Sequence, residues 1–236
     1  MAPTTFTYTA ASLYEQVVTE CGGSGLSSAQ RDAVRNGIRE ALIDVWHDSP
    51  WTWRIKRTTI TLCPGTPYQE LPDDWDGFAL TEIYRTDTDD AESHFMALAS
   101  DADFERLYFS ASSGEPQLFR VSNRLCGSTW AYVLEGAPKP DATYTYASVA
   151  YYSAAPYLTF SESTPPNMPT EFHDLWHEKA AANAARVLGL EDLAASHDAQ
   201  YHIKMDRARK RRDVSFPKGP PRGLRDPYKD WQSLIW

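Results

Sequence analysis

The sequence predicts an α+β fold in which helical segments at both ends enclose a β-rich middle. Apolar residues at helical spacing, with capping signals, occur in the first 50 residues and again after residue 168. Between residues 54 and 160 the pattern changes to short β-branched runs separated by turn residues. Because these strands are grouped and do not alternate with helices, antiparallel sheet is favoured over parallel βαβ units.

Two helices are predicted in the N-terminal segment. Residues 12–15 (Ser-Leu-Tyr-Glu) have the form of a capping box, and the glycine-rich residues 21–25 end the helix that follows. A second box at residues 27–30 precedes a longer amphipathic helix, which Pro50 ends. The apolar face of that helix consists of Val34, Ile38, Ala41, Leu42, Val45 and Trp46.

The middle of the chain contains several candidate strands and one short helix, which is predicted at residues 101–109. Turn residues at 64–65, 127–128 and 135–136 supply connections between strands. The predicted strands are residues 58–62, 68–71, 78–84, 117–121, 129–134 and 143–152.

Two further helices are predicted after a proline-containing loop at residues 161–168. The first begins at Pro169–Thr170 and is ended or kinked by Gly189. The second covers residues 191–212, with acidic residues at its start and basic residues at its end, as the helix dipole favours. The apolar face of the first consists of Phe172, Trp176, Ala180, Ala184, Val187 and Leu188.

These elements divide the chain into four predicted parts. Residues 1–53 hold the N-terminal helices, residues 54–160 form a β-rich insertion, and residues 161–213 hold the C-terminal helices. Residues 214–236 form an extended tail, because proline and glycine recur there too often for helix.

The charge of the chain is unevenly distributed, although its total is −9. Residues 201–236 hold ten Lys/Arg against four Asp/Glu, whereas the other 200 residues hold 13 against 28. An acidic body disfavours binding of nucleic acid, since phosphate contacts need clustered Lys and Arg. The basic segment could contact nucleic acid or an acidic protein surface.

The sequence predicts no membrane span, because its apolar runs are far shorter than about 20 residues. The N-terminal residues show no secretory signal. Three widely spaced cysteines, Cys21, Cys63 and Cys126, form no CxxC pair, which favours reduced thiols over a zinc ribbon.

Candidate metal and catalytic residues are few. His173 and His177 are four residues apart on a predicted helix, but the following Glu178 is not placed as in an HExxH motif, so polar helix faces are preferred to a metal site. The acidic runs at residues 73–76 and 86–90 lack the glycine and closing glutamate of a calcium loop, so solvated turns are expected. No catalytic residue, metal ligand or cofactor is predicted.

Trp51 and Trp53 directly follow the long helix and admit two interpretations. The preferred one is packing where helix joins sheet. The other is a stacking platform for bases or sugars, which the nearby Arg54, Lys56 and Arg57 keep open.

The C-terminal tail combines a basic, Pro/Gly-spaced stretch with large apolar residues. Unburied apolar groups reduce solubility, so such anchors indicate a partner surface. Folding back on its own domain is the alternative; docking on another subunit or protein is favoured. The residues assigned to docking are Phe216, Arg222, Leu224, Arg225, Tyr228, Trp231, Leu234, Ile235 and Trp236.

Residues 33–46 (AVRNGIREALIDVW) lead into Pro-Trp-Thr-Trp-Arg at 50–54, a Thr-rich strand at 58–62, Pro-Gly-Thr at 64–66 and YQELPDDWD at 68–76. This order resembles the head-to-tail adaptor (connector) proteins of tailed bacteriophages, a group that includes the tail tubular protein A type. The motifs cover most of residues 28–85, and the remainder resembles the group only in its order of helix, sheet, helix and tail. The β-rich middle is longer than in the smallest adaptors.

The resemblance implies that the N- and C-terminal helices form a bundle around the β insertion. It implies a structural virion protein, not an enzyme, that forms a homo-oligomeric, dodecameric ring at the head–tail interface after assembly in the host cytoplasm. The partners implied are the portal protein and a downstream tail or nozzle protein, and genomic DNA would pass through the channel without specific binding. Alternatives left open are a virion-associated hydrolase and a nucleic-acid-binding module acting through the basic tail.

In this interpretation the tail docks on the portal. A second set of residues is assigned to packing, either in the core of the subunit or between neighbouring subunits. That set consists of Ile38, Leu42, Trp46, Trp51, Trp53, Phe172 and Trp176.

Overall fold

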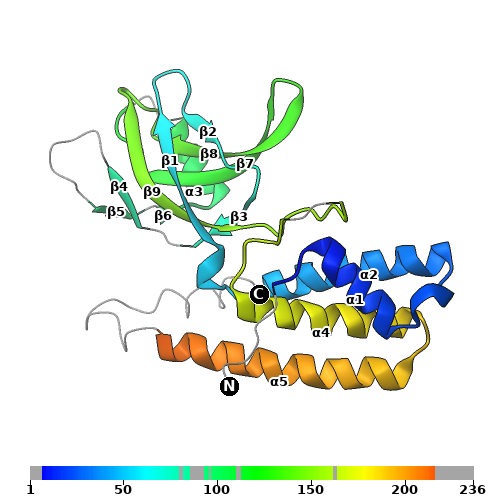
Figure 1. The fold of residues 1–236 in the computed structure, drawn as a ribbon. Helices are drawn as coiled ribbons and strands as arrows, with labels where there is room; N and C mark the ends of the chain where they lie inside the picture. Colours follow the sequence, from blue (N-terminus) through cyan, green and yellow to red (C-terminus); the bar gives the residue numbers. More distant parts are fainter. Residues whose placement is uncertain are drawn as a thin grey trace. The chain divides into compact units, whose positions relative to one another are not determined.

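The computed structural model describes residues 7–79, 82–85, 93–95, 97–109, 113–161 and 164–215 (Figure 1). The fold is mixed α+β, as the sequence predicts, and divides into two units. The helical unit comprises the described residues of Met1–Ala41 and Thr170–Trp236, and the β unit comprises those of Leu42–Pro169. The long helix α2 contributes its residues up to Ala41 to the helical unit and its last six residues, 42–47, to the β unit.

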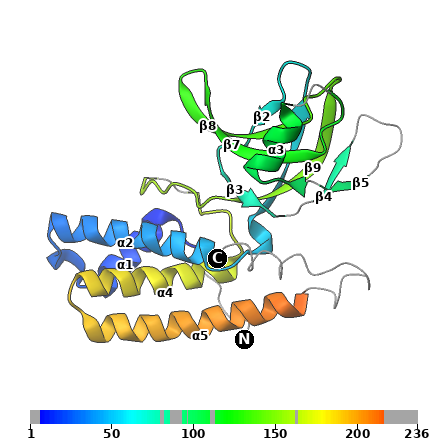
Figure 2. The ribbon, with the colours of Figure 1, turned by 180° about the vertical axis from the view of Figure 1, so that it is seen from behind.

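The helical unit is built around α4, which contacts the other helices (Figure 2). Its apolar face is rich in alanine, and α2 approaches so closely that a Cβ on Gly37 would lie 3.3 Å from the Cβ of Asn183. The indole Nε1 of Trp176 donates to the carbonyl oxygen of Ile38 at 3.0 Å. The helices are α1 (Ala10–Glu20), η1 (Gly23–Gly25), α2 (Ser28–His47), α4 (Thr170–Val187) and α5 (Glu191–Ser215).

The first capping box is displaced from its predicted position. Helix α1 begins at Ala10 with Thr9 as its N-cap, and Ser12 is the third helical residue rather than the cap. Thr9 Oγ1 accepts a hydrogen bond from the Ser12 amide at 3.0 Å, and Ser12 Oγ accepts one from the Thr9 amide at 2.9 Å. Ser12 therefore occupies the third helical position of the capping box, where glutamate or glutamine is usual. The second predicted box, between Ser27 and Gln30, is confirmed by the same reciprocal pair.

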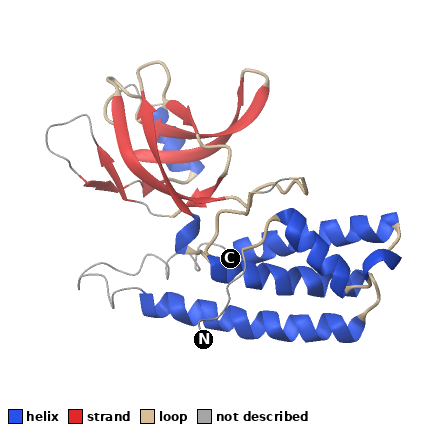
Figure 3. Cartoon of the chain, in the orientation of Figure 1, coloured by secondary structure: helices blue, strands red, loops and turns tan. Residues whose placement is uncertain are grey.

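The β unit contains two sheets, shown in red in Figure 3. In the described residues, one sheet has the order β1-β9-β4-β5 with β3 also paired to β9, and the other has the order β2-β8-β7-β6. All pairings are antiparallel except that of β6 with β7. The elements are η2 (Thr52–Arg54), β1 (Ile55–Leu62), β2 (Tyr68–Glu70), β3 (Trp75–Phe78), β4 (Glu82–Arg85), β5 (Ser93–Phe95), β6 (Ala97–Leu98), α3 (Asp101–Tyr108), β7 (Leu118–Cys126), β8 (Thr129–Ala137) and β9 (Tyr144–Ser153).

The single strand predicted at residues 78–84 is wrong. The chain instead forms β3 and β4, which pair with successive parts of β9. Six positions separate Phe78 from Tyr84, whereas four separate their partners Tyr151 and Ala147. The register relative to β9 therefore shifts by two positions between Phe78 and Tyr84, and no local sequence pattern reveals a shift that depends on the partner strand.

The core of the β unit lies between the two sheets. Leu62 and Tyr146 are fully buried there, and Phe119 packs edge-to-face on Tyr146. Helix α3 covers the other face of β7 and β8, where the guanidinium of Arg120 lies 4.4 Å from the ring centroid of Phe104. The buried cluster consists of Ile60, Leu62, Leu71, Phe119, Leu134, Tyr144, Tyr146 and Val149.

No helix in the described ranges combines the length and the apolar character that a membrane crossing requires.

Candidate docking surfaces

The junction between α2 and β1 is capped by the residues that follow the helix. The last carbonyl groups of a helix lack intrahelical donors. Here the Trp51 indole donates to the carbonyl of Val45 at 2.9 Å, and Arg54 Nη1 donates to that of Trp46 at 2.9 Å. The tryptophan–arginine segment therefore acts as a side-chain cap, in addition to the packing interpretation given to Trp51.

Arg54 is the most deeply buried cation in the described residues, with 4% of its surface exposed. Its Nε and Nη2 donate to the carbonyl oxygen of Ser153 at 3.1 and 3.0 Å, and Nη2 also pairs with Asp76. Burial lowers the pKa of Arg54 below its ordinary value, although the hydrogen bond and the charge of Asp76 oppose that shift. Sequence reasoning placed Arg54 beside a stacking platform and missed this role.

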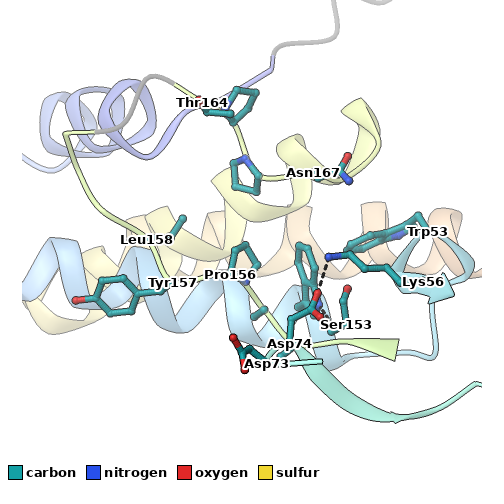
Figure 4. Close-up of a pocket in the computed structure, with 15 residues that line it drawn as sticks. Trp53, Lys56, Asp73, Asp74, Ser153, Pro156, Tyr157, Leu158, Thr164 and Asn167 are labelled. Atoms are coloured by element: carbon teal, nitrogen blue, oxygen red, sulfur yellow. Dashed lines mark hydrogen bonds and ion pairs between the residues drawn. The ribbon is translucent and has the colours of Figure 1, made fainter. Parts of the chain in front are cut away.

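An open cleft of about 430 Å³ lies beside this junction, within the β unit (Figure 4). Trp53 lines it, packed edge-to-face on Trp46 with ring centroids 4.7 Å apart, and Tyr157 stands 79% exposed at its edge. The lining residues are Trp46, Trp53, Lys56, Asp73, Asp74, Ser153, Ala154, Ala155, Pro156, Tyr157, Leu158, Thr164, Pro165, Pro166 and Asn167.

The acidic run at residues 73–76 is not a solvated turn throughout. Asp74 forms an ion pair with Lys56 and accepts a hydrogen bond from the Tyr151 hydroxyl at 3.0 Å. Burial acts to raise the pKa of Asp74, but the bonds from Lys56 and Tyr151 outweigh it, so the pKa is lowered. Burial and the Asp74 carboxylate raise the pKa of Tyr151 to about 12. Asp73 and Asp74 lie in a turn, as expected, whereas Asp76 lies in β3, and both Asp74 and Asp76 form ion pairs although more than a third of each side chain is exposed. The run at residues 86–90 lies outside the described residues.

A polar network joins α1, α4 and α5 in the helical unit. His177 Nε2 lies 3.1 Å from both carboxylate oxygens of Glu20, and His197 Nδ1 donates to Glu178 at 2.7 Å. Lys204 Nζ donates to the other oxygen of Glu178 at 2.6 Å. We call Glu20, His177, Glu178, His197 and Lys204 the polar network. It ties α5, which buries a narrow apolar stripe, to the rest of the unit.

The preferred interpretation, two polar faces of the helix, is wrong for His173 but agrees with the polar surroundings of His177. His173 is buried, and its Nδ1 accepts from the amide of Tyr8 at 3.2 Å. His177 stacks on the Tyr8 ring and belongs to the polar network. Among the residues that the structure describes, no group of three or more His, Cys, Asp or Glu has the arrangement of a metal site.

The polar network makes the helical unit sensitive to acid. Burial acts to raise the pKa of Glu20 and Glu178, but hydrogen bonds from His177 and Gln16 to Glu20, and from Lys204 and His197 to Glu178, lower both. A carboxylate with a lowered folded pKa adds stability that is complete above its ordinary pKa of 4.5 and is lost as the pH falls through the folded pKa.

We expect Glu178→Gln to reduce the free energy of unfolding by about 1–3 kcal/mol at neutral pH, and to flatten its decline below about pH 4.5. Urea unfolding followed by helical circular dichroism at several pH values measures both effects. Glu15→Gln, at an exposed position on α1, is the matched control and should match wild type. Equal pH profiles for Glu178→Gln and wild type would contradict the assignment.

The structure places most residues of the packing set in the two cores. Ile38, Phe172 and Trp176 are buried in the helical unit, and Leu42, Trp46 and Trp51 in the β unit, whereas Trp53 is half-buried at the cleft. Side chains this buried contact their own chain, so subunit contacts are to be sought at exposed positions. All docking residues predicted from Phe216 to Trp236 lie outside the described residues.

The order of helices, β unit and helices extends over a region that also matches a known protein family. The family described as SU10 adaptor protein matches residues 8–222. The chain belongs to this family. No curated protein matches the chain.

Membership gives this SU10 adaptor protein a structural role as a phage adaptor in the virion, where it interacts with portal and tail components. The family is structural and not known for enzymatic activity. The functional surfaces of a structural adaptor are the surfaces that contact other proteins. The cleft and the junction beside it are candidates for such a contact surface.

Proposed function

We propose that this SU10 adaptor protein forms a dodecameric ring that attaches to the portal and connects the capsid to the tail, with a channel for DNA. The observation that carries the proposal is the family match over residues 8–222, which includes both units. The downstream partner is a tail or nozzle protein, and the relationship to tail tubular protein A type adaptors is the finer part of the proposal.

In this ring the helices of the helical unit act as the bundle of each subunit, and the β unit is the insertion. The close approach of α2 to α4 at Gly37, together with the polar network, supports a rigid element. Rigid subunits lose little conformational entropy on assembly, which favours a stable ring.

The tail, predicted at residues 214–236, is proposed to dock on the portal through the residues that follow α5, which ends at Ser215. The family match ends at residue 222, so Leu224 and the residues after it lie beyond the matched region. Their apolar side chains supply anchors, and Arg222, Arg225 and the other basic residues steer the tail toward an acidic partner surface.

The channel is proposed to pass genomic DNA without binding it. Residues 1–200 hold 13 Lys/Arg and 28 Asp/Glu, and like charge repels the phosphate backbone. The last part of the proposal is that the ring assembles in the host cytoplasm.

Electron microscopy of the purified protein mixed with its portal tests the ring directly. We expect twelve-fold class averages with a central opening and density for the adaptor on one face of the portal. Particles without rotational symmetry, or portal alone in every class, would refute the proposal.

A further inference from the structure

The β7–β8 hairpin extends beyond the sheet to which it belongs (Figure 1 and Figure 2). In the described residues, β6 pairs with β7 at Leu118 and Phe119, and β2 pairs with β8 from Val133 to Glu135, beyond which the Leu71 amide donates to the Tyr132 carbonyl at 2.9 Å. In the described residues, β7 from Asn123 to Cys126 and β8 from Thr129 to Ala131 pair only with each other. We call these two segments and the Gly127–Ser128 turn the arm.

One face of the arm continues the core face of the β unit. Paired residues of antiparallel strands share a face, and the face alternates along each strand. Val121 and Leu134 pair and contribute to the core, and the pairs farther out on the same face are Asn123 with Tyr132 and Leu125 with Trp130. The apolar face therefore runs from the core to the tip.

These outer side chains are exposed although they are large and uncharged. Trp130 is 70% exposed, Leu125 58% and Tyr132 51%. The two aromatic residues alone present about 200–250 Å² of surface, compared with about 800 Å² per partner in a standard interface. A two-stranded ribbon alone is marginally stable in water. On its polar face the arm is supported by Arg124, whose guanidinium lies 4.2 Å from the ring centroid of Tyr68, so a further contact is expected on its apolar face.

The same unit offers a surface of matching chemistry in its cleft. Aromatic, proline and aliphatic side chains make up most of the cleft lining, beside the polar residues Ser153, Thr164 and Asn167, and its volume of about 430 Å³ is sufficient for large side chains. Lys56 and Asp74 pair with each other, so Asp73 is the remaining charged group in its lining. A cleft that is mainly apolar, with a few polar groups, suits uncharged aromatic anchors.

We propose that the arm of one copy docks, through Leu125 and Trp130, in the cleft of a second copy of this chain. The chain carries both the projecting apolar arm and the receiving cleft, which makes a second copy the occupant. A contact between different patches of identical subunits is head-to-tail and generates a ring when its rotation closes. The proposal rests on the proposed function for the ring, and it supplies the contact that the buried packing residues do not.

Cross-linking from the arm tip tests which surface receives it. Cys126 is the last residue of β7, and Cys63 is the other thiol that is not buried, so a Cys63→Ser variant carries a thiol-reactive photo-cross-linker on Cys126. Mixed with isotope-labelled chains, it should form adducts with residues 153–158 or 164–167 of a labelled copy. The cross-linker on Cys63 of a Cys126→Ser variant is the control and should not reach those segments. Adducts from Cys126 that are confined to its own chain, or that miss both segments, would overturn the proposal.

Self-association provides the second test. We expect Trp130→Ser to weaken self-association about 30-fold or more by sedimentation, as loss of an interface anchor does. Phe109→Ser is the matched control, because Phe109 is 73% exposed in the same unit but outside the arm, and it should change the affinity less than about threefold. Leu125→Ser is used if Trp130→Ser does not fold.

A wild-type chain that stays monomeric, or arm variants that associate like wild type, would overturn arm docking. Portal binding is measured separately on the same variants, which keep the tail. Failure of portal binding with arm-dependent self-association would refute the proposed function and leave the arm contact standing.

Discussion

Replacement of Arg54 by methionine is expected to lower the free energy of unfolding of the β unit by about 2–4 kcal/mol, because it removes charge-assisted hydrogen bonds to two buried carbonyl groups. Arg54 bonds to the carbonyls of Trp46 and Ser153 and to the carboxylate of Asp76. Without it the Trp46 carbonyl at the end of α2 loses its donor, and Ser153 retains only the Trp46 indole bond among those described. Methionine keeps apolar volume, so the loss measures the polar contacts.

Urea unfolding followed by tryptophan fluorescence measures this effect. Asp76→Asn is the matched control: the Asp76 side chain is 36% exposed, and screening limits the expected cost to about 1 kcal/mol. Arg54→Lys should fall between the two, since an ammonium group cannot bond to all three partners with the geometry of a guanidinium. An Arg54→Met variant within 1 kcal/mol of wild type would show that the network contributes little to stability.

The helices could be predicted from the sequence because their signals are local. Apolar spacing and the Ser27–Gln30 box identify α2, and Gly189, at φ +74°, comes just after α4. The start of α1 was misplaced because Thr9 with Ser12 satisfies the same reciprocal bonds as the expected serine–glutamate pair. A sequence pattern for the capping box therefore has to allow serine, as well as glutamate or glutamine, at the third helical position.

The contact residues were harder to predict because their partners are distant in sequence. Arg54 meets Ser153 and Asp76 only after β9 and β3 have paired, and His197 meets Glu178 only when α5 packs on α4. The arm had a local signal, since Leu125, Trp130 and Tyr132 follow strand alternation on either side of a glycine turn. Alternation predicts a buried face, and it does not reveal that the neighbouring strands end before the tip.

Deletion of residues 228–236 is expected to abolish portal binding while leaving both units folded. The deletion removes Trp231, Leu234, Ile235 and Trp236, each worth about 1.5–3 kcal/mol if fully buried in the partner. Part of this gain is offset by ordering the tail, so a loss of more than about a thousandfold in affinity is expected. The family-matched region, residues 8–222, remains intact, so thermal unfolding should not change.

Binding to immobilised portal measures the loss, and two variants separate the apolar anchors from charge. Trp231→Ala with Trp236→Ala should reproduce most of the deletion, because aromatic anchors dominate contact energies. Lys229→Gln, in the same segment, should alter mainly the association rate and its salt dependence, since a charge at the rim acts through steering. Retention of the deleted chain at wild-type affinity would assign portal binding to another surface. A larger effect of Lys229→Gln than of the double tryptophan variant would make the contact electrostatic, and the apolar end of the tail would then need a different partner.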